Sequence, residues 1–234
     1  MIDFKWRHFQ KELILMLISW YVAYPLSYRD IEELMLERGS TVDHSTVNRW
    51  VVRYSPLLED EFRKKHKRSV GTSWRMDETY IKVKGVWCYL YRAVDKGGDT
   101  IDFMLSKKRD TAAAEAFFRK AIQSSGVPQK VNIDKSGANK AGLDAINAQL
   151  FLFALLMGLS LMQIEIRQVK YLNNRIEQDH RGIKRITKPM MGFKAFYSAE
   201  ATLAGIELHR MIKKGQHIQA DNQSIFEQFY ALAA

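Results

Sequence analysis

Acidic residues stand at three places in the chain where metal-dependent phosphodiester chemistry would need them. Asp77 lies in the segment W-R-M-D-E-T-Y, Asp134 ends V-N-I-D, and Glu177 lies in N-N-R-I-E-Q-D-H-R-G-I-K. Carboxylate oxygens suit Mg²⁺ or Mn²⁺, and two such ions can stabilise both the attacking and the leaving oxygen of an in-line displacement at phosphorus. The three carboxylates, carried on two strands and a helix, therefore predict a site for two metal ions.

The two strand positions leave alternatives open. Successive side chains of a strand point to opposite faces, so either Asp77 or Glu78 is expected to face the site, but not both. A single aspartate such as Asp134 is commonly a turn cap or a solvated strand end. Residue type alone therefore does not decide the ligand set on the strands.

Helix geometry favours Glu177 over Asp179 in the third segment. Glu177 shares a face with Arg181 and Lys184, whereas Asp179 is turned by about 200°. The structural alternative is an intrahelical ion pair between Glu177 and Arg181. The residues expected to hold DNA phosphates on this side of the helix are Asn174, His180, Arg181 and Lys184.

The overall charge favours a polyanionic partner. The 234 residues carry a formal net charge of +10, and residues 163–217 hold eleven Lys and Arg against five Asp and Glu. Clustered cations release counterions from a phosphate backbone, so this balance predicts DNA binding, although a merely basic protein has the same charge. The densest positive segment contains Glu177.

The remaining bulk features predict a cytoplasmic protein. Cys88 is the single cysteine, which rules out an internal disulfide framework and fits a reducing compartment. No secretory signal is evident at the N-terminus. The apolar runs at 13–24 and 150–162 are shorter than the roughly 20 residues that a membrane-spanning helix needs, so buried helices and no membrane are expected.

The first 60 residues show the pattern of a helix-turn-helix. A helix over 8–24 is followed by one that Ser27 caps and Gly39 ends, and then by a third helix over 43–54. A small helical bundle without DNA binding gives the same pattern. As a recognition helix, the third would present Ser45, Asn48, Arg49 and Arg53 to DNA.

The rest of the chain alternates between strands and helices. A basic linker is expected at 61–73, then three strands, a helix over 111–123, a strand at 130–134, and the order helix, strand, helix. This order predicts the α/β fold class, with a ribonuclease H-like mixed sheet flanked by helices. The expected domains are a helix-turn-helix domain at 1–60, the linker, a catalytic domain at 74–215 and a tail at 216–234.

Several motifs in this order resemble the bacterial insertion-sequence transposases of the group called "IS six". The similarity runs from about residue 4 to residue 214 through D-H-S-T-V-N-R-W, W-R-M-D-E-T-Y-I-K-V, Y-L-Y-R-A-V-D, I-D-K-S-G-A-N-K-A, R-Q-V-K-Y-L-N-N-R-I-E-Q-D-H-R-G-I-K-R and G-F-K-A-F. The resemblance implies an Asp-Asp-Glu triad of Asp77, Asp134 and Glu177. Lys184 matches the basic residue that follows the family's glutamate.

The resemblance also implies an activity. Such a transposase binds terminal inverted repeats, cuts 3′ ends and joins them to target DNA with divalent metal, which produces cointegrates. Since two ends must meet, a homodimer or larger assembly is expected, and the run 150–162 is a candidate interface. Forty-two residues separate Asp134 from Glu177, a longer spacer than in compact relatives, which marks the same run as an insertion or a subgroup feature.

Two other functions fit the same residues. A DNA-binding regulator or a decayed transposase would bind repeats without cutting them. A structure-selective nuclease of the same fold would cleave DNA without needing residues 1–60.

Overall fold

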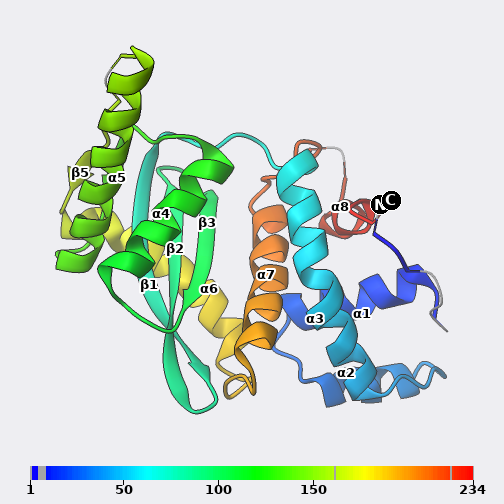
Figure 1. The fold of residues 1–234 in the computed structure, drawn as a ribbon. Helices are drawn as coiled ribbons and strands as arrows, with labels where there is room; N and C mark the ends of the chain where they lie inside the picture. The colour runs from blue at the N-terminus through cyan, green and yellow to red at the C-terminus, as the bar shows by residue number, and fades with distance from the viewer. Residues whose placement is uncertain (1, 5–8, 161, 222, 234) are drawn as a thin grey trace. The chain divides into compact units, whose positions relative to one another are not determined.

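A computed structural model describes residues 2–4, 9–160, 162–221 and 223–233. The chain packs as two compact units, each made of separate stretches of sequence (Figure 1). The first unit holds residues 1–68, 82–85 and 182–234, and the second holds residues 69–81 and 86–181.

The second unit is built on one mixed sheet. Its five strands are β1 (Ser73–Val83), β2 (Val86–Asp95), β3 (Thr100–Ser106), β4 (Lys130–Asn132) and β5 (Glu165–Arg167). They lie in the order β3-β2-β1-β4-β5, with β2 and β3 antiparallel and with β4 parallel to both β1 and β5. This order, with helices flanking the sheet, confirms the predicted ribonuclease H-like α/β fold.

Two tight turns connect the first three strands. Lys84 and Gly85 both have positive φ values, 50° and 80°, as a two-residue hairpin turn requires. At the next turn, the Asp95 carboxylate accepts hydrogen bonds from the backbone N–H groups of Gly98 (2.9 Å) and Asp99 (3.0 Å). These local features were predictable because each depends on neighbouring residues.

Helices α4 (Thr111–Ser125) and α5 (Gly137–Met157) pack on the sheet through its apolar core. The Asp110 side chain caps α4 by accepting a hydrogen bond from the Ala113 backbone N–H at 2.9 Å. The two helices come close at Gly142, where an added Cβ would lie 2.9 Å from the Cβ of Ala114. The core includes Trp74, Met76, Tyr91, Phe117, Phe118, Val131 and Leu143.

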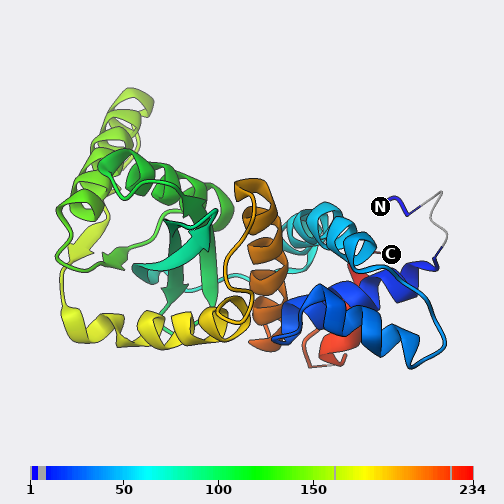
Figure 2. The same ribbon diagram turned by 90° about the horizontal axis from the view of Figure 1, so that it is seen from below.

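A third helix, α6 (Asn174–Thr187), follows a short 3-10 helix at Lys170–Asn173. Within the second unit, its first turns run along the side of the sheet away from α4 (Figure 2). Ile176 and His180 are its buried side chains there. The strand expected between the last two helices is β5, which is only three residues long and is followed closely by this 3-10 helix.

The first unit is all helical apart from two isolated bridges. It contains α1 (Lys11–Ala23), α2 (Tyr28–Leu36), α3 (His44–Glu61), α7 (Phe196–Lys213) and α8 (Ile225–Ala231). Ser27 and Asp30 form the predicted capping box of α2, with hydrogen bonds of 3.1 and 2.7 Å. The start expected for the first helix, residue 8, lies outside the described residues.

The packing differs from the expected domain boundaries at both ends. Residues Phe62–His66, expected in a linker, continue α3 as a turn of π-helix. The chain from Gly182 onward packs with the N-terminal helices, because α7 lies against α1 and α3. A Cβ at Gly205 would meet side-chain atoms of Val22 and Ser55 at 2.7 Å, so glycine permits this close approach.

By length and composition alone, α5 satisfies the criterion for a helix that could cross a membrane. Only 22% of that apolar window is buried in the structure. The apolar run that begins at residue 150 forms the last part of α5, and it is not the buried helix that was expected. Its exposed side chains include Phe151, Leu152, Phe153, Leu155, Leu156 and Met157.

We expect Gly142→Val to lower the free energy of unfolding by about 1–3 kcal/mol, because overpacking forces α4 and α5 apart. The measurement is urea unfolding followed by circular dichroism. Ala141→Val, which places the same side chain at an exposed position of α5, is the control and should change stability much less. Equal effects of the two substitutions would contradict the close contact at Gly142.

Candidate active site

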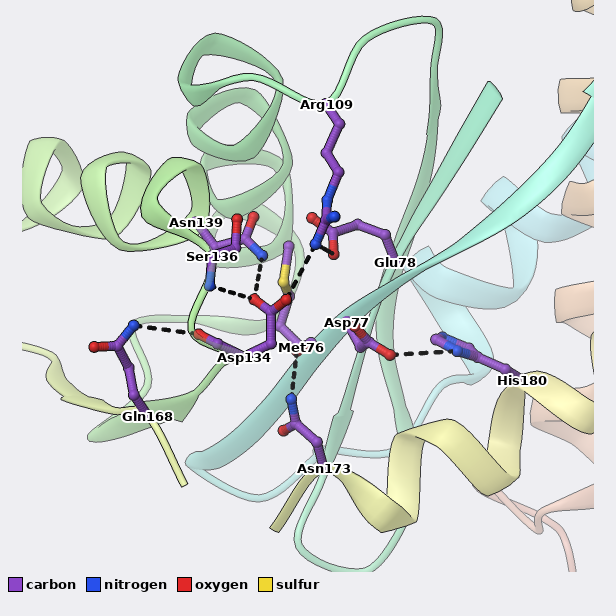
Figure 3. A network of polar contacts seen from close by, with 10 residues as sticks. All are labelled: Met76, Asp77, Glu78, Arg109, Asp134, Ser136, Asn139, Gln168, Asn173 and His180. Carbon is purple, nitrogen blue, oxygen red and sulfur yellow. Dashed lines mark hydrogen bonds and ion pairs between the residues drawn. The ribbon is translucent and has the colours of Figure 1, made fainter. Parts of the chain in front are cut away.

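Three carboxylates gather where β1 and the end of β4 lie side by side. Asp77 and Glu78 come from β1, and Asp134 follows β4 by two residues. Each offers an oxygen within 4.8 Å of the oxygens of the other two. Figure 3 shows these side chains converging from the two strands. The structure thus brings together Asp77 and Asp134, as expected, and adds Glu78.

Glu78 corrects the expectation that only one residue of the pair faces the site. Along β1 the buried side chains are Trp74 and Met76 before the pair, but Thr79 and Ile81 after it. Trp74 and Met76 belong to the core cluster that includes residues of α4 and α5, whereas Thr79 and Ile81 do not, so the strand is buried on both faces and strict alternation can be kept. The oxygens of Asp77 and Glu78 still lie within 4.8 Å of one another and of Asp134, so alternation along the strand did not exclude Glu78 from the group.

Arg109 lies between two of the carboxylates. One of its Nη atoms is 3.2 Å from an Oε of Glu78 and 3.1 Å from an Oδ of Asp134. Burial opposes the charge of the guanidinium, but the adjacent Glu78 and Asp134 outweigh it and raise the Arg109 pKa. Arg109 therefore neutralises part of the negative charge of the site.

The loop after β4 fixes the direction of Asp134. Its Oδ1 accepts hydrogen bonds from the backbone N–H of Ser136 (3.0 Å) and from the side-chain amide of Asn139 (3.2 Å). The amide of Gln168 donates to its backbone carbonyl at 3.3 Å (Figure 3). These bonds leave the second carboxylate oxygen directed toward Arg109.

Asp77 has the most perturbed acidity in the site. Burial raises its pKa, and the negative charges of Glu78, Asp134 and Glu177 raise it further, to about 7. His180 Nδ1 lies 3.7 Å from its carboxylate. A carboxylate in this environment gains free energy from any cation placed beside it.

Glu177 lies in the first turn of α6 and is exposed to solvent. Its charge contributes to the raised pKa of Asp77, but it is outside the group of three oxygens within 4.8 Å. Asp179, the alternative on this helix, forms an ion pair with the fully buried Arg92 at 2.6 Å. Asp179 thus anchors the helix, and the assignment of Glu177 to the triad stays a prediction.

A buried amide pair connects α6 to the strands that carry the acids. The Asn132 side chain donates to the Asn173 side chain at 2.5 Å, and Asn173 donates to the Met76 carbonyl at 3.5 Å. Asn132 also exchanges hydrogen bonds with the backbone of Val169, at 3.1 and 3.2 Å. This pair sets the start of the helix that carries Glu177.

The residues expected to touch DNA occupy different environments. Ser45, Arg49 and Arg53 are exposed on α3, while Asn48 is half-buried. On α6, the exposed residues are Asn174, Arg181 and Lys184. His180 is buried, with its Nδ1 3.7 Å from the Asp77 carboxylate, and its expected contact with DNA stays a prediction.

The donor set fits a divalent metal ion. Within the described part of the chain, Glu78 Oε1 is buried without a hydrogen-bond partner, and a metal ion would satisfy it. Hard carboxylate oxygens are the preferred ligands of Mg²⁺ and Mn²⁺. Asp77, Glu78 and Asp134 could hold such an ion.

Few sequence patterns indicate the residues that support the site. Arg109 lies 25 residues before Asp134 in a polar loop, and nothing in its surroundings indicates an ion pair with the site. Arg92 is a charge inside an apolar strand, Y-L-Y-R-A-V-D, and that unusual position was the one available signal.

Comparisons with known proteins place this geometry among transposases. A family model described as a DDE domain matches residues 71–216. The transposase for the insertion sequence-like element IS431mec of Staphylococcus aureus is 42% identical over 215 residues, which cover 91% of this chain and 90% of that protein. The transposase for insertion sequence element IS257 in transposon Tn4003, from the same species, has the same identity and coverage.

Solved structures of retroviral integrases are also similar to part of this chain. The HTLV-2 integrase catalytic core domain in complex with magnesium, in a trimeric form, has a TM-score of 0.42 and 19% identity over 59% of this chain and 86% of that chain. The BIV integrase core has a TM-score of 0.41 and 15% identity over 60% of this chain and 84% of that chain.

The raised pKa of Asp77 predicts that the metal-free protein loses stability as pH rises. In the unfolded chain Asp77 ionises near 3.8, but in the fold near 7, so the fold binds the extra proton between these values. We expect a loss of roughly 2–4 kcal/mol from pH 4 to pH 7.5 through this group. Urea unfolding in a chelator, as a function of pH, measures it.

In this experiment Asp77→Asn should flatten the pH dependence, because the amide mimics the protonated acid. The control Asp144→Asn removes an exposed carboxylate of α5 that pairs with Lys140, and should keep the slope of the wild type. Parallel curves for the wild type and Asp77→Asn would contradict the raised pKa.

Proposed function

The chain belongs to the DDE transposases of the group called "IS six", and from this premise we propose that it cuts and joins DNA at the ends of an insertion sequence. It binds the terminal inverted repeats, cleaves the 3′ ends of the element and transfers them to target DNA, forming cointegrates. The observation that carries the proposal is the cluster of Asp77 and Asp134, together with the contribution of the Glu177 charge to the raised pKa of Asp77.

The triad would act through divalent metal, Mg²⁺ or Mn²⁺, with two ions per site. When bound, the ions supply activation of the attacking oxygen and stabilisation of the leaving oxygen. Asp77 lies on β1, and Asp134 lies two residues after β4, the parallel neighbour of β1, so the pairing of these strands brings the two carboxylates together. Glu177 approaches from α6, and its exposed position leaves room for a DNA strand beside it.

Other side chains position the acidic residues, balance their charge and offer contacts to DNA phosphates. His180 orients Asp77, and Arg109 balances the charge of Glu78 and Asp134. Arg181 and Lys184 present cations on the exposed side of the helix that carries Glu177, where they can hold the phosphates that flank the cleaved bond.

End recognition is assigned to the helices at residues 1–60. In α3, Asp43 caps the helix by accepting the Ser45 N–H at 2.8 Å, and Arg49 and Arg53 project into solvent. This N-terminal end of an exposed, cation-bearing helix suits the major groove. The active complex holds two ends, so we assign it at least two copies of the chain, acting at the bacterial nucleoid in the cytoplasm.

We expect Glu177→Gln to reduce strand transfer by more than about 10³-fold, since removal of a group that stabilises the transition state costs several kcal/mol. The measurement is joining of a repeat-ended duplex to plasmid DNA with Mg²⁺. Binding of the same duplex should remain within about twofold of wild type, because the helices at residues 1–60, and not the carboxylate of Glu177, recognise the ends.

The matched control for this variant is Glu165→Gln, which makes the same change at an exposed glutamate of β5. It should retain strand transfer. Full activity of Glu177→Gln would remove this residue from the triad, and absence of joining by the wild type with either metal would contradict the proposed reaction.

We expect Arg49→Ala to lower the preference for the inverted repeat over a scrambled duplex by about tenfold, because one base contact contributes about 1–3 kcal/mol of discrimination. Fluorescence anisotropy with both duplexes measures it. Arg119→Ala, on α4, removes the same charge as a control. An unchanged preference in Arg49→Ala would exclude this residue from base recognition.

A further inference from the structure

The first unit contains a cavity that the proposed chemistry does not use. Its volume is about 320 Å³, within the range of small-ligand sites. Residues of α1, of the end of α6, of α7 and of α8 form its wall: Ser19, Trp20, Val22, Ala23, Tyr24, Gly182, Arg185, Ile186, His209, Arg210, Lys213, Ile225 and Phe226.

The cavity is positively charged. Arg185, Arg210 and Lys213 line it, and none of its lining residues is acidic. Burial lowers the pKa of His209, and the positive charges of Lys213 and Arg210 add to this effect, so that the pKa is about 4. The imidazole is therefore neutral at pH 7 and can donate or accept a hydrogen bond. An anion is the ligand that this wall would stabilise.

The position of the Arg210 guanidinium depends on the lack of a side chain at Gly182. A Cβ at Gly182 would lie 1.6 Å from a guanidinium nitrogen of Arg210, so the guanidinium occupies the space beside α6 that any other residue would fill. Arg210 is thus held flat against the helix backbone at the cavity wall.

Part of the wall is aromatic. Trp20, Tyr24 and Phe226 line the cavity, and Tyr24 and Phe226 are 55% and 45% exposed. The guanidinium of Arg38 lies 5.5 Å from the centre of the Trp20 ring. Exposed rings beside cations are the combination that holds bases and phosphates of a single strand.

We propose that this cavity binds one unpaired nucleotide of a DNA strand. The base stacks on the aromatic wall, and its phosphate contacts the cations at Arg185, Arg210 and Lys213. A base pair is too large to enter a space of 320 Å³, so the ligand is an unpaired or displaced nucleotide. The inference rests on the proposed action on DNA and adds a second contact outside the carboxylate site.

The test compares two DNA duplexes with the full-length protein. One carries a single unpaired 2-aminopurine next to the duplex, and the other is the same duplex with that base paired. We expect at least fivefold tighter binding of the first, measured by anisotropy at one fixed salt concentration. Stacking on the cavity wall should also quench the 2-aminopurine fluorescence.

Two variants locate the site. Phe226→Ala removes one aromatic side chain of the wall, and Lys213→Ala removes an exposed cation. In each variant the duplex with the unpaired base should bind less than twofold tighter than the paired duplex, and the quenching of 2-aminopurine should be lost. Arg119→Ala, which lies outside the cavity lining, should keep both. Thermal unfolding followed by circular dichroism confirms that each variant is folded.

The outcomes separate the two proposals. Equal binding of both duplexes by the wild type overturns the nucleotide site and leaves the transposase function standing. A preference that survives in both cavity variants also overturns the site. Failure to bind either duplex contradicts action on DNA itself, and with it this inference.

Discussion

Repulsion between carboxylates that share a partly buried site is the constraint on which the second unit depends. Asp77, Glu78 and Asp134 present oxygens within 4.8 Å of one another, and the pKa of Asp77 is raised to about 7 as a result of burial and these charges. Such an arrangement persists only where the scaffold over-determines it. Arg109 and His180 offset part of the cost.

The scaffold meets this constraint with buried polar bonds rather than with apolar packing alone. Asn132 and Asn173 join β4 to the start of α6, and Arg92 and Asp179 hold the same helix one turn further along. Both pairs cross between elements far apart in sequence. Because an unsatisfied buried partner would be costly, each pair specifies where the helix carrying Glu177 lies.

Much of the fold was predictable because it depends on near neighbours. The capping box of Ser27 and the turn at Lys84 and Gly85 are local, and motif order indicated the ribonuclease H-like sheet. The participation of Glu78 was not predictable, since it depends on how close Asp134 and Arg109 come to β1 in space. Nor was the packing of α7 against α1 and α3, because long-range contacts leave no periodic signal.

The contact between Gly182 and Arg210 has a consequence for the evolution of the chain. A side chain at position 182 and the guanidinium at position 210 compete for the same space, so a residue larger than glycine at 182 requires the end of Arg210 to move away or residue 210 to be smaller. The constraint runs in one direction: related sequences with a larger residue at 182 should have the side chain at 210, 28 residues further on, shortened or turned away.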